Sequence, residues 1–328
     1  MSSTTVPPRR RWRGTAVPCV VVALVAVLVA GILPLASPLL LALLAGLVVA
    51  NVLDPARVTR WQDPGLTRAL LRVGVVLLGL RLSVADLADL GIRGVGVVVV
   101  VVAVTFGATW VLGRRMGLES GLVVLVAAGF SVCGAAAIAA VESGVRRRPA
   151  DVAVAIGLVT VFGTVMIPLI PLAATALGLD EVQAGVWAGA SIHEVAQVLA
   201  AASLTGSTAL GAATTIKLAR VALLGAVFVA SRMLAGSSEE GGRAPLVPWF
   251  VAGFLVAVLV RTSGVLPDVA LDVADTAATL ALAAAMFGLG MTVTTSALRK
   301  AERRALALAL VSTLVAAGTS LGLVLLLF

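Results

Sequence analysis

The chain is poor in charged side chains and has a single histidine. Charged residues make up 12% of its 328 residues, whereas a soluble domain carries about 25%. Hydrophobic residues make up 60%, and the mean hydropathy is +1.13. This composition excludes an ordinary soluble domain and predicts a polytopic membrane protein.

Scarce metal-ligating and phosphate-binding residues exclude several enzyme classes. Cys19 and Cys133 both lie in apolar segments, which supports neither a disulfide framework nor a zinc cluster. Residues 193–197 read H-E-V-A-Q and differ from the zinc-protease motif H-E-x-x-H, because Gln197 stands where the second histidine ligand belongs. Neither lysine follows a glycine, so there is no G-x-x-x-x-G-K-[ST] phosphate loop. We expect no enzymatic activity, no metal and no cofactor.

The apolar residues form continuous runs of about 18 to 25 residues, which suit spanning helices rather than the alternating strands of a barrel. The predicted spans are 16–33, 36–53, 66–81, 91–112, 119–141, 150–176, 182–203, 210–233, 247–263, 274–292 and 302–328. We therefore expect an all-α polytopic membrane protein with about eleven transmembrane helices. Residues 1–15 would form a cytoplasmic N-terminal segment and residues 16–328 a single transmembrane transporter domain. The N-terminal run resembles a signal peptide, but the next stretch is also apolar, which favours an uncleaved helix.

The basic residues predict the orientation. The net charge is +8, and the arginines cluster in short loops between apolar runs, as positive-inside signals do, rather than in a nucleic-acid-binding surface. With the N-terminus in the cytoplasm, most of the 24 lysines and arginines fall on the cytoplasmic side, and the C-terminus lies outside. The triplet Arg146 to Arg148 is the exception, because the predicted spans place it outside.

Two pairs of segments resemble each other. Residues 128–140 (AGFSVCGAAAIAA) align with 188–200 (AGASIHEVAQVLA), and 79–84 (GLRLSV) align with 288–293 (GLGMTV). Weak internal similarity is typical of inverted-repeat transporters, in which discontinuous helices from two halves meet near the midplane. The glycines in the first aligned pair predict helix breaks there.

Four ionisable residues lie close together inside apolar segments. His193 directly precedes Glu194, and Lys217 and Arg220 follow in the next segment. Each such residue costs roughly 2.5 to 3.5 kcal/mol at membrane depth, so their presence indicates a functional site. On a helix His193 and Gln197 share a face, as do Lys217 and Arg220, and a hairpin would bring the two pairs together.

This arrangement suits an anion and a coupling ion. Lys217 and Arg220 would attract an oxyanion or carboxylate, and a helix N-terminus at the predicted break would add N–H donors. Glu194, with His193, would bind a coupling proton or sodium. Two other interpretations stay open: Glu194 neutralises a cation as a structural ion pair, and His193 is a hydrogen-bonded packing residue.

Small residues complete the candidate set. Ser131 and Ser191 either line a cavity or hydrogen-bond to their own helices. Cys133 lies in a run of small residues, where a packing role is expected. Gly185 and Gly189 form G-x-x-x-G, which predicts close helix contact rather than function.

Four strings together resemble a bacterial family. WAGASIHEVAQVLAA (187–201), GFSVCGAAAIAAV (129–141), GLRLSVADL (79–87) and GLGMTVTTSALRK (288–300) are similar to the YeiH family, whose members are commonly labelled sulfate exporters. The resemblance extends from about residue 35 onward. It implies the architecture of bile-acid/sodium symporters and sodium/proton antiporters, in which a panel of helices rocks against a core with two crossing broken helices. By position, it implies a site containing Ser131, Cys133, Gly134, Ser191, His193, Glu194 and Gln197, with Lys217 and Arg220 nearby.

We therefore expect a secondary active transporter of a small anion, such as sulfate, in the cell inner membrane. It would work by alternating access, and the resemblance makes a homodimer a reasonable expectation. A sodium/proton exchanger and a non-transporting sensor or complex subunit are the alternatives. The cationic pair favours an anion, because two positive charges would repel a bound cation.

Overall fold

The computed structural model describes residues 8–32, 38–89, 91–142, 144–236, 249–292 and 302–328. The regular elements in these ranges are helices, which confirms the all-α prediction. They are α1 (Pro8–Ile32), α2 (Pro38–Val52), α3 (Pro55–Trp61), α4 (Pro64–Leu78), η1 (Gly79–Arg81), α5 (Val84–Asp89), α6 (Gly91–Arg115), α7 (Ser120–Ser131), α8 (Ala135–Val141), α9 (Pro149–Ala176), α10 (Glu181–Ser191), α11 (Val195–Ser203), α12 (Ser207–Ala222), α13 (Leu224–Ala235), α14 (Trp249–Thr262), α15 (Asp268–Gly290) and α17 (Arg303–Leu327).

Several described helices are long and apolar enough to cross a membrane. By length and composition, these are α6, α9 from Ala150 onward, α15 and α17, and the pair α12 and α13, bent by 42°, adds a fifth. The apolar helices α2, α7 and α14, and α1 from Val17 onward, are shorter. These helices support the predicted membrane protein, whereas the count of about eleven spans stays a prediction.

Local sequence signals begin several helices. Asp63 Oδ1 accepts hydrogen bonds from the N–H groups of Gly65 and Leu66, and Pro64 occupies the first turn of α4, where its missing N–H leaves no bond unmade. At the start of α10, Asp180 accepts from the Gln183 N–H while the Gln183 side chain accepts from the Asp180 N–H. These caps fix where each chain segment enters the bundle.

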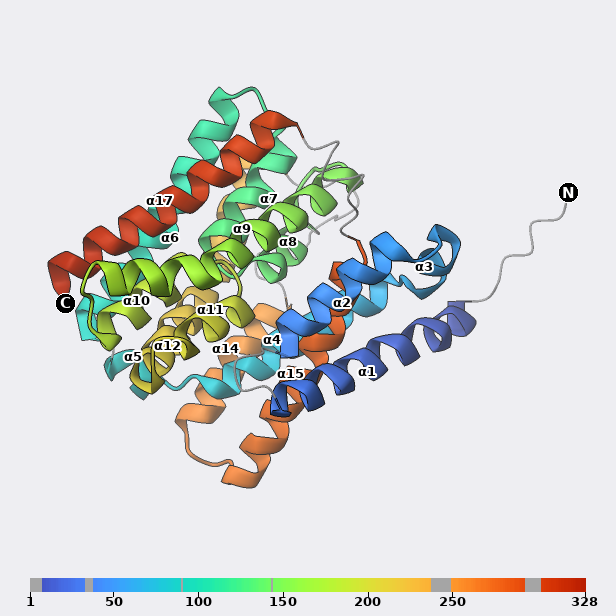
Figure 1. Ribbon diagram of the computed structural model, residues 1–328, viewed down its shortest axis with the longest axis horizontal. Coiled ribbons are helices and arrows are strands. Elements are labelled where there is room, and N and C mark those ends of the chain that lie inside the picture. The colour runs from blue at the N-terminus through green and yellow to red at the C-terminus, as the bar shows by residue number, and fades with distance from the viewer. Residues whose placement is uncertain (1–7, 33–37, 90, 143, 237–248, 293–301) are drawn as a thin grey trace, which may run out of the picture.

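The helices form two groups (Figure 1). The panel consists of α1, α2, α4, α14 and α15, which contact mainly one another. Glycines allow this close approach: Gly46 and Gly290 face each other's helix backbones, and Gly288 lies against Thr67. The second group consists of α6 to α12 and α17, and we call it the hairpin group because it contains two helical hairpins, described below. The two groups meet in few places, chiefly where α2 contacts α11, α4 contacts α8 and α14 contacts α12.

The predicted crossing segment at 119–141 doubles back instead of crossing. It consists of α7 and α8, separated by a three-residue break in which Gly134 has φ of 72°, a conformation that favours glycine. Gly121, at the start of α7, lies against the backbone of Arg146 and Arg147, which follow α8. The chain therefore returns to the end of the molecule from which it entered, and we call this segment hairpin 1.

The predicted crossing segment at 182–203 also doubles back. It consists of α10 and α11, and Gly206, after α11, lies against the Glu181 side chain at the start of α10. We call this segment hairpin 2. The prediction of two crossing discontinuous helices is therefore corrected to two helical hairpins. The pattern of residues locates a helix break, but the contacts between distant residues decide the angle at that break.

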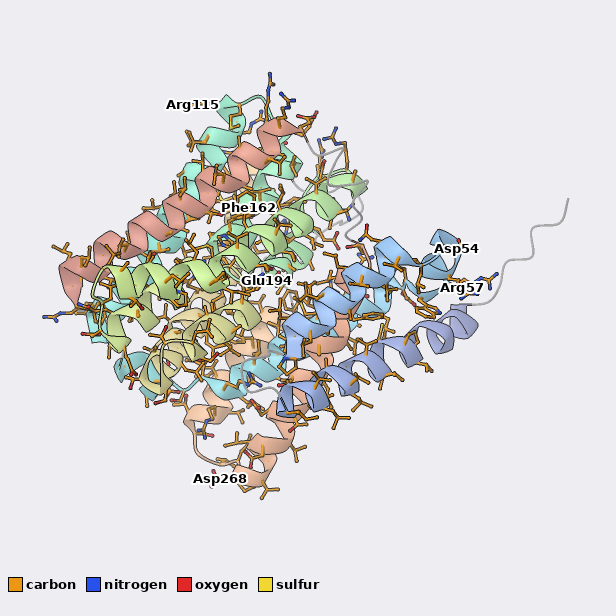
Figure 2. The ribbon with its side chains drawn as sticks, in the orientation of Figure 1. Asp54, Arg57, Arg115, Phe162, Glu194 and Asp268 are labelled. Atoms are coloured by element: carbon orange, nitrogen blue, oxygen red, sulfur yellow. The ribbon has the colours of Figure 1, made fainter. Side chains whose placement is uncertain are left out.

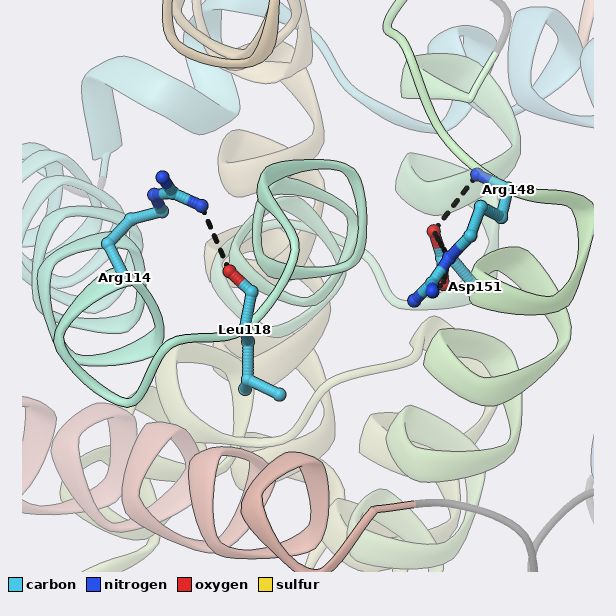
Figure 3. Close-up of polar contacts among 4 residues, drawn as sticks. All are labelled: Arg114, Leu118, Arg148 and Asp151. Carbon is cyan, nitrogen blue, oxygen red and sulfur yellow. Dashed lines mark hydrogen bonds and ion pairs between the residues drawn. The ribbon is translucent and has the colours of Figure 1, made fainter.

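Hairpin 1 brings Arg146 to Arg148 to the end of the molecule that holds Arg68. Glu142, just after α8, forms ion pairs with Arg68 and Arg147, each at 3.4 Å. Arg148 donates hydrogen bonds to Asp151 at the start of α9. The same close-up shows Arg114 donating to the Leu118 carbonyl, in the connection between α6 and α7 (Figure 3). We call this the arginine-rich end. Because hairpin 1 returns to this end, the triplet lies with Arg68 and agrees with the charge rule.

Candidate functional site at the hairpin tips

The two hairpins break at aligned positions of the two similar segments. α7 ends at Ser131 and α10 at Ser191, and these serines are aligned partners. α8 begins at Ala135 and α11 at Val195, which are also aligned partners. Each hairpin therefore has a tip of three residues, and the two tips meet beside α12.

Arg220 of α12 caps both hairpins at once. Its side chain is fully buried. Nε and Nη2 donate to the Ser131 carbonyl at 3.1 and 2.9 Å, and Nη2 also donates to the Phe130 carbonyl at 3.1 Å. Nη1 donates to the carbonyls of Gly189, Ala190 and Ile192 at 3.0, 2.7 and 3.1 Å. The guanidinium thus satisfies carbonyls at the C-terminal ends of α7 and α10, which have no partner inside their own helices.

Lys217 connects the two tips one turn earlier on α12. Its fully buried ammonium donates to the carbonyls of Val132 and Ile192, both at 2.8 Å, and to the His193 carbonyl. The three ammonium hydrogens and the five guanidinium hydrogens of Arg220 therefore all have carbonyl acceptors. In this conformation neither head group has a donor left for direct contact with an anion. Any attraction would act through charge, and the predicted anion-binding role of both residues stays a prediction.

Glu194 belongs to the tip of hairpin 2, and its carboxylate points to hairpin 1. Oε1 accepts from the Ala135 N–H at 3.4 Å, and Gly134 leaves the space that the Glu194 side chain fills. Oε2 is buried without a hydrogen-bond partner among the described residues. In that same part of the chain Glu194 forms no ion pair with Lys217 or Arg220, so the structure does not support a purely structural ion pair.

His193 points to a different neighbour from Glu194. Its ring lies 4.4 Å from the Phe130 ring, and Nε2 lies 3.1 Å from Thr313 Oγ1 on α17. The Thr313 hydroxyl also donates to the Ala309 carbonyl, which leaves its oxygen available to accept from Nε2. Ile192 and Glu194 have extended backbone, with ψ of 146° and 149°, so neighbouring side chains diverge here. The shared helical face predicted for His193 and Gln197 is therefore wrong.

Gln197 fixes hairpin 2 against α9. Its Nε2 donates to the Thr160 carbonyl at 3.2 Å, and its Oε1 accepts from the Glu194 N–H at 3.2 Å. Gly163 provides the room, because a Cβ at that position would collide with the Gln197 amide. Apart from Gly163 itself, no feature of the sequence indicates this contribution of α9.

The remaining small residues have local roles. The Ser131 hydroxyl donates to the Ala128 carbonyl and the Ser191 hydroxyl to the Trp187 carbonyl, as in the alternative of bonding to their own helices. Gly185 and Gly189 lie against the backbone of α12 at Ala209 and Ala213, which confirms the predicted close contact.

A small cavity separates the hairpin tips from the panel. Its volume is about 40 Å³, enough for about three water molecules. Its lining residues are Leu39, Leu71, Val75, Leu78, Cys133, Ala135, Ala136, Glu194, Val195, Val221, Leu282 and Met286. Of the predicted site residues, Cys133 and Glu194 line this cavity, and Glu194 lies in the middle of the molecule (Figure 2). The panel side is apolar, and nothing in the sequence distinguished those residues from other lipid-compatible ones.

A second cavity of about 340 Å³ lies at the arginine-rich end. It is lined on the panel side by residues including Thr67 and Arg68, and on the other side by Ala139, Glu142 and Arg147. Helix α8 lines both cavities, because Ala136 faces the small one and Ala139, about one turn later, faces the large one. The large cavity therefore lies directly beyond the small one along α8.

Comparison with known proteins identifies the family. A family model described as Conserved hypothetical protein 698 matches residues 16–309. The UPF0324 membrane protein of Corynebacterium glutamicum is 40% identical over 279 residues, which cover 83% of this chain and 80% of the relative. The chain belongs to the UPF0324 membrane protein family. Another UPF0324 relative, the inner membrane protein YeiH of Escherichia coli K12, is 35% identical over 285 residues, covering 84% and 81% of the two chains. The YeiH resemblance is thus confirmed.

A third UPF0324 membrane protein, from Pseudomonas putida, is 38% identical over 282 residues, covering 83% of this chain and 80% of the relative. No solved structure matches significantly. The UPF0324 relatives therefore agree with the helices in placing this chain among membrane proteins.

Proposed function

We propose that this UPF0324 protein is a secondary transporter that moves a small anion by alternating access. One observation carries the proposal: the buried carboxylate of Glu194, with one oxygen unpartnered among the described residues, lines a cavity between two hairpin tips and a separate panel of helices. Ionisable groups at membrane depth mark ion or substrate pathways. An oxygen in such a position can take up a proton or a metal ion without losing an existing bond.

The charge around the tips favours an anion as substrate. Lys217 and Arg220 supply two positive charges and Glu194 one negative charge. The partial charges of about half a unit at the C-terminal ends of α7 and α10 are balanced by those at the N-terminal ends of α8 and α11. One net positive charge remains in a dry region, where its field is weakly screened and reaches the cavity. This field would attract a small anion such as sulfate and would repel an additional cation.

The division into two helix groups supports alternating access. The panel helices are held together by close backbone contacts at Gly46, Gly288 and Gly290, whereas few contacts join them to the hairpin group. Rocking of one group against the other would open the small cavity to each side in turn. We place the arginine-rich end and the N-terminus in the cytoplasm on the charge rule. The larger cavity would then be the cytoplasmic approach to Glu194.

Each polar residue has a proposed role in this transporter. Glu194 exchanges the coupling ion, and Arg220 and Lys217 hold the tips and supply the positive field. His193 and Gln197 fix hairpin 2 against α17 and α9. Coupling follows if the anion and the coupling ion together stabilise one arrangement of the two groups more than the other.

Transport by reconstituted protein tests the proposal. Purified protein in liposomes receives a panel of radiolabelled small anions, beginning with sulfate, with and without pH and sodium gradients. We expect wild-type protein to accumulate at least one anion when a gradient is applied. Glu194→Gln should lose gradient-driven accumulation and retain exchange of internal for external anion, because the substitution removes the exchangeable charge and leaves the positive field in place.

A surface substitution provides the control. Glu119→Gln removes a carboxylate from an exposed position before α7 and should leave accumulation unchanged. If Glu194→Gln accumulated anion to the same level as wild-type protein, the proposed coupling mechanism would be refuted. Absence of flux for every anion under every gradient would remove the transporter itself.

A further inference from the structure

The Lys217 ammonium lies in a cage of main-chain oxygen atoms contributed by both hairpin tips. Val132 belongs to hairpin 1, and Ile192 and His193 belong to hairpin 2. The ammonium nitrogen lies 2.8 Å from the oxygen atoms of Val132 and Ile192, and the His193 oxygen completes the cage. The residue is fully buried, so no water competes for these oxygen atoms. This one ammonium therefore contacts both tips.

Carbonyl groups at a chain reversal inside a membrane need a partner, because lipid provides none. An oxygen-only cage is the environment that hard metal cations prefer, at distances of about 2.3 to 2.6 Å for calcium. The cage around Lys217 is only a few tenths of an ångström wider than that. A neutral amine would satisfy it poorly, because it has two hydrogens and a lone pair that would face a carbonyl oxygen.

We propose that Lys217 is a built-in cation that occupies the place of a sodium ion between the hairpin tips. Its ammonium provides the charge and the three contacts that a bound sodium would provide, and it cannot dissociate. The position between the tips therefore needs no sodium, and we assign the exchangeable coupling ion to a proton at Glu194. This second statement rests on the proposed transport function, whereas the cage itself does not.

Two substitutions at Lys217 test the cage without any transport measurement. Lys217→Ala removes the ammonium and leaves space between the tips, whereas Lys217→Met fills that space with an uncharged side chain of similar length. Both variants and the wild type are purified in detergent with methylammonium chloride and exchanged into choline, sodium, lithium or methylammonium chloride at one ionic strength. Thermal unfolding is then followed in each salt.

We expect the wild type to unfold at the same temperature in sodium and choline. Lys217→Ala should be less stable in choline and should gain about 5 °C or more in sodium, lithium or methylammonium, with a saturable dependence on concentration. Lys217→Met should be destabilised and should show no such gain. A sodium-specific gain in the wild type would overturn the proposal. The proposal would also be overturned if no cation stabilised Lys217→Ala or allowed it to be purified in folded form.

The flux assay separates this inference from the proposed function. If wild-type protein transports an anion at equal rates in sodium and choline, both stand. If transport requires sodium, the assignment of the coupling ion to a proton is refuted, whereas the transporter and the cage remain. If no anion is transported but Lys217→Ala is stabilised by small cations, the cage is supported and the transporter is refuted.

Discussion

Removal of the Arg220 side chain should destabilise the protein more than any other single change at the hairpin tips. The guanidinium donates to the carbonyls of five residues, distributed over the ends of α7 and α10. Arg220→Ala leaves these acceptors without their partner in a region that contains no room for bulk water, because Arg220 is fully buried. The two hairpins would also lose the charge that holds their negative helix ends side by side.

The size of the effect follows from these contacts. Each buried polar group left unsatisfied costs about 1 to 3 kcal/mol, and removing one partner of a buried charged group costs about 3 to 5 kcal/mol. Some carbonyls would find new partners through relaxation, so we take about 3 to 5 kcal/mol as the expected loss. At about 2 °C per kcal/mol for a chain of this size, the unfolding temperature should fall by about 6 to 10 °C. Arg220→Lys keeps the charge but loses the planar fork, and it should lose about half as much.

Thermal unfolding of purified protein in detergent, followed by fluorescence or light scattering, measures this loss. Arg115→Ala is the matched control, because Arg115 is exposed at the end of α6; it should change stability by less than about 0.5 kcal/mol. An unfolding temperature for Arg220→Ala within about 2 °C of wild type, less than 1 kcal/mol, would refute the bridging role. Equal stability of the lysine and arginine proteins would show that charge alone is needed.

Further predictions concern the glycines and the cavity. Gly189→Ala should lower the unfolding temperature, because its Cβ would lie 2.5 Å from the Ala213 carbonyl oxygen. Gly211→Ala meets open space on α12 and should raise stability by up to about 1 kcal/mol. Thermal unfolding curves of the two variants test both expectations. Gly163→Ala should displace Gln197 and reduce anion flux in liposomes with a stability loss of about 1 to 3 kcal/mol; full flux would contradict this. In a Cys19→Ser background, a small thiol reagent should label Cys133, which lines the small cavity. A transported anion should slow this labelling, which mass spectrometry measures. Absence of labelling with and without the anion would contradict access to the cavity.

The sequence predicted the composition-driven features of the fold. Apolar runs predicted helices in a membrane protein, and the aligned segments 128–140 and 188–200 predicted two equivalent breaks, which the structure places in the same register. Both are local properties of the chain. The direction of the chain after each break depends instead on contacts between distant residues. The contact that closes hairpin 1 joins Gly121, at the start of α7, to Arg147, in the loop after α8. The arginine triplet, which the predicted spans place outside, is the sequence signal that argues against a crossing at 119–141.

The sequence predicted that His193, Glu194, Lys217 and Arg220 lie close together, but the contact that each of them makes could not be derived from spacing. Lys217 and Arg220 donate to main-chain carbonyls, a contact that spacing did not predict, and their attraction of an anion stays a prediction. Each helix end leaves about four carbonyls without partners, so two predicted breaks already implied a demand for buried donors. His193 and Glu194 were expected to act as a pair, but extended backbone turns them to different neighbours. The span predicted at 182–203 treats both positions as helical.

The most direct test of the central claim follows proton movement with anion movement. Liposomes containing the protein and an internal pH-sensitive dye receive an inward gradient of the transported anion in sodium-free buffer. We predict an anion-dependent change of internal pH with wild-type protein and none with Glu194→Gln, although Glu194→Gln should still exchange anion across the membrane. An unchanged pH signal from Glu194→Gln would contradict the account, because the coupling proton would then not pass through this carboxylate.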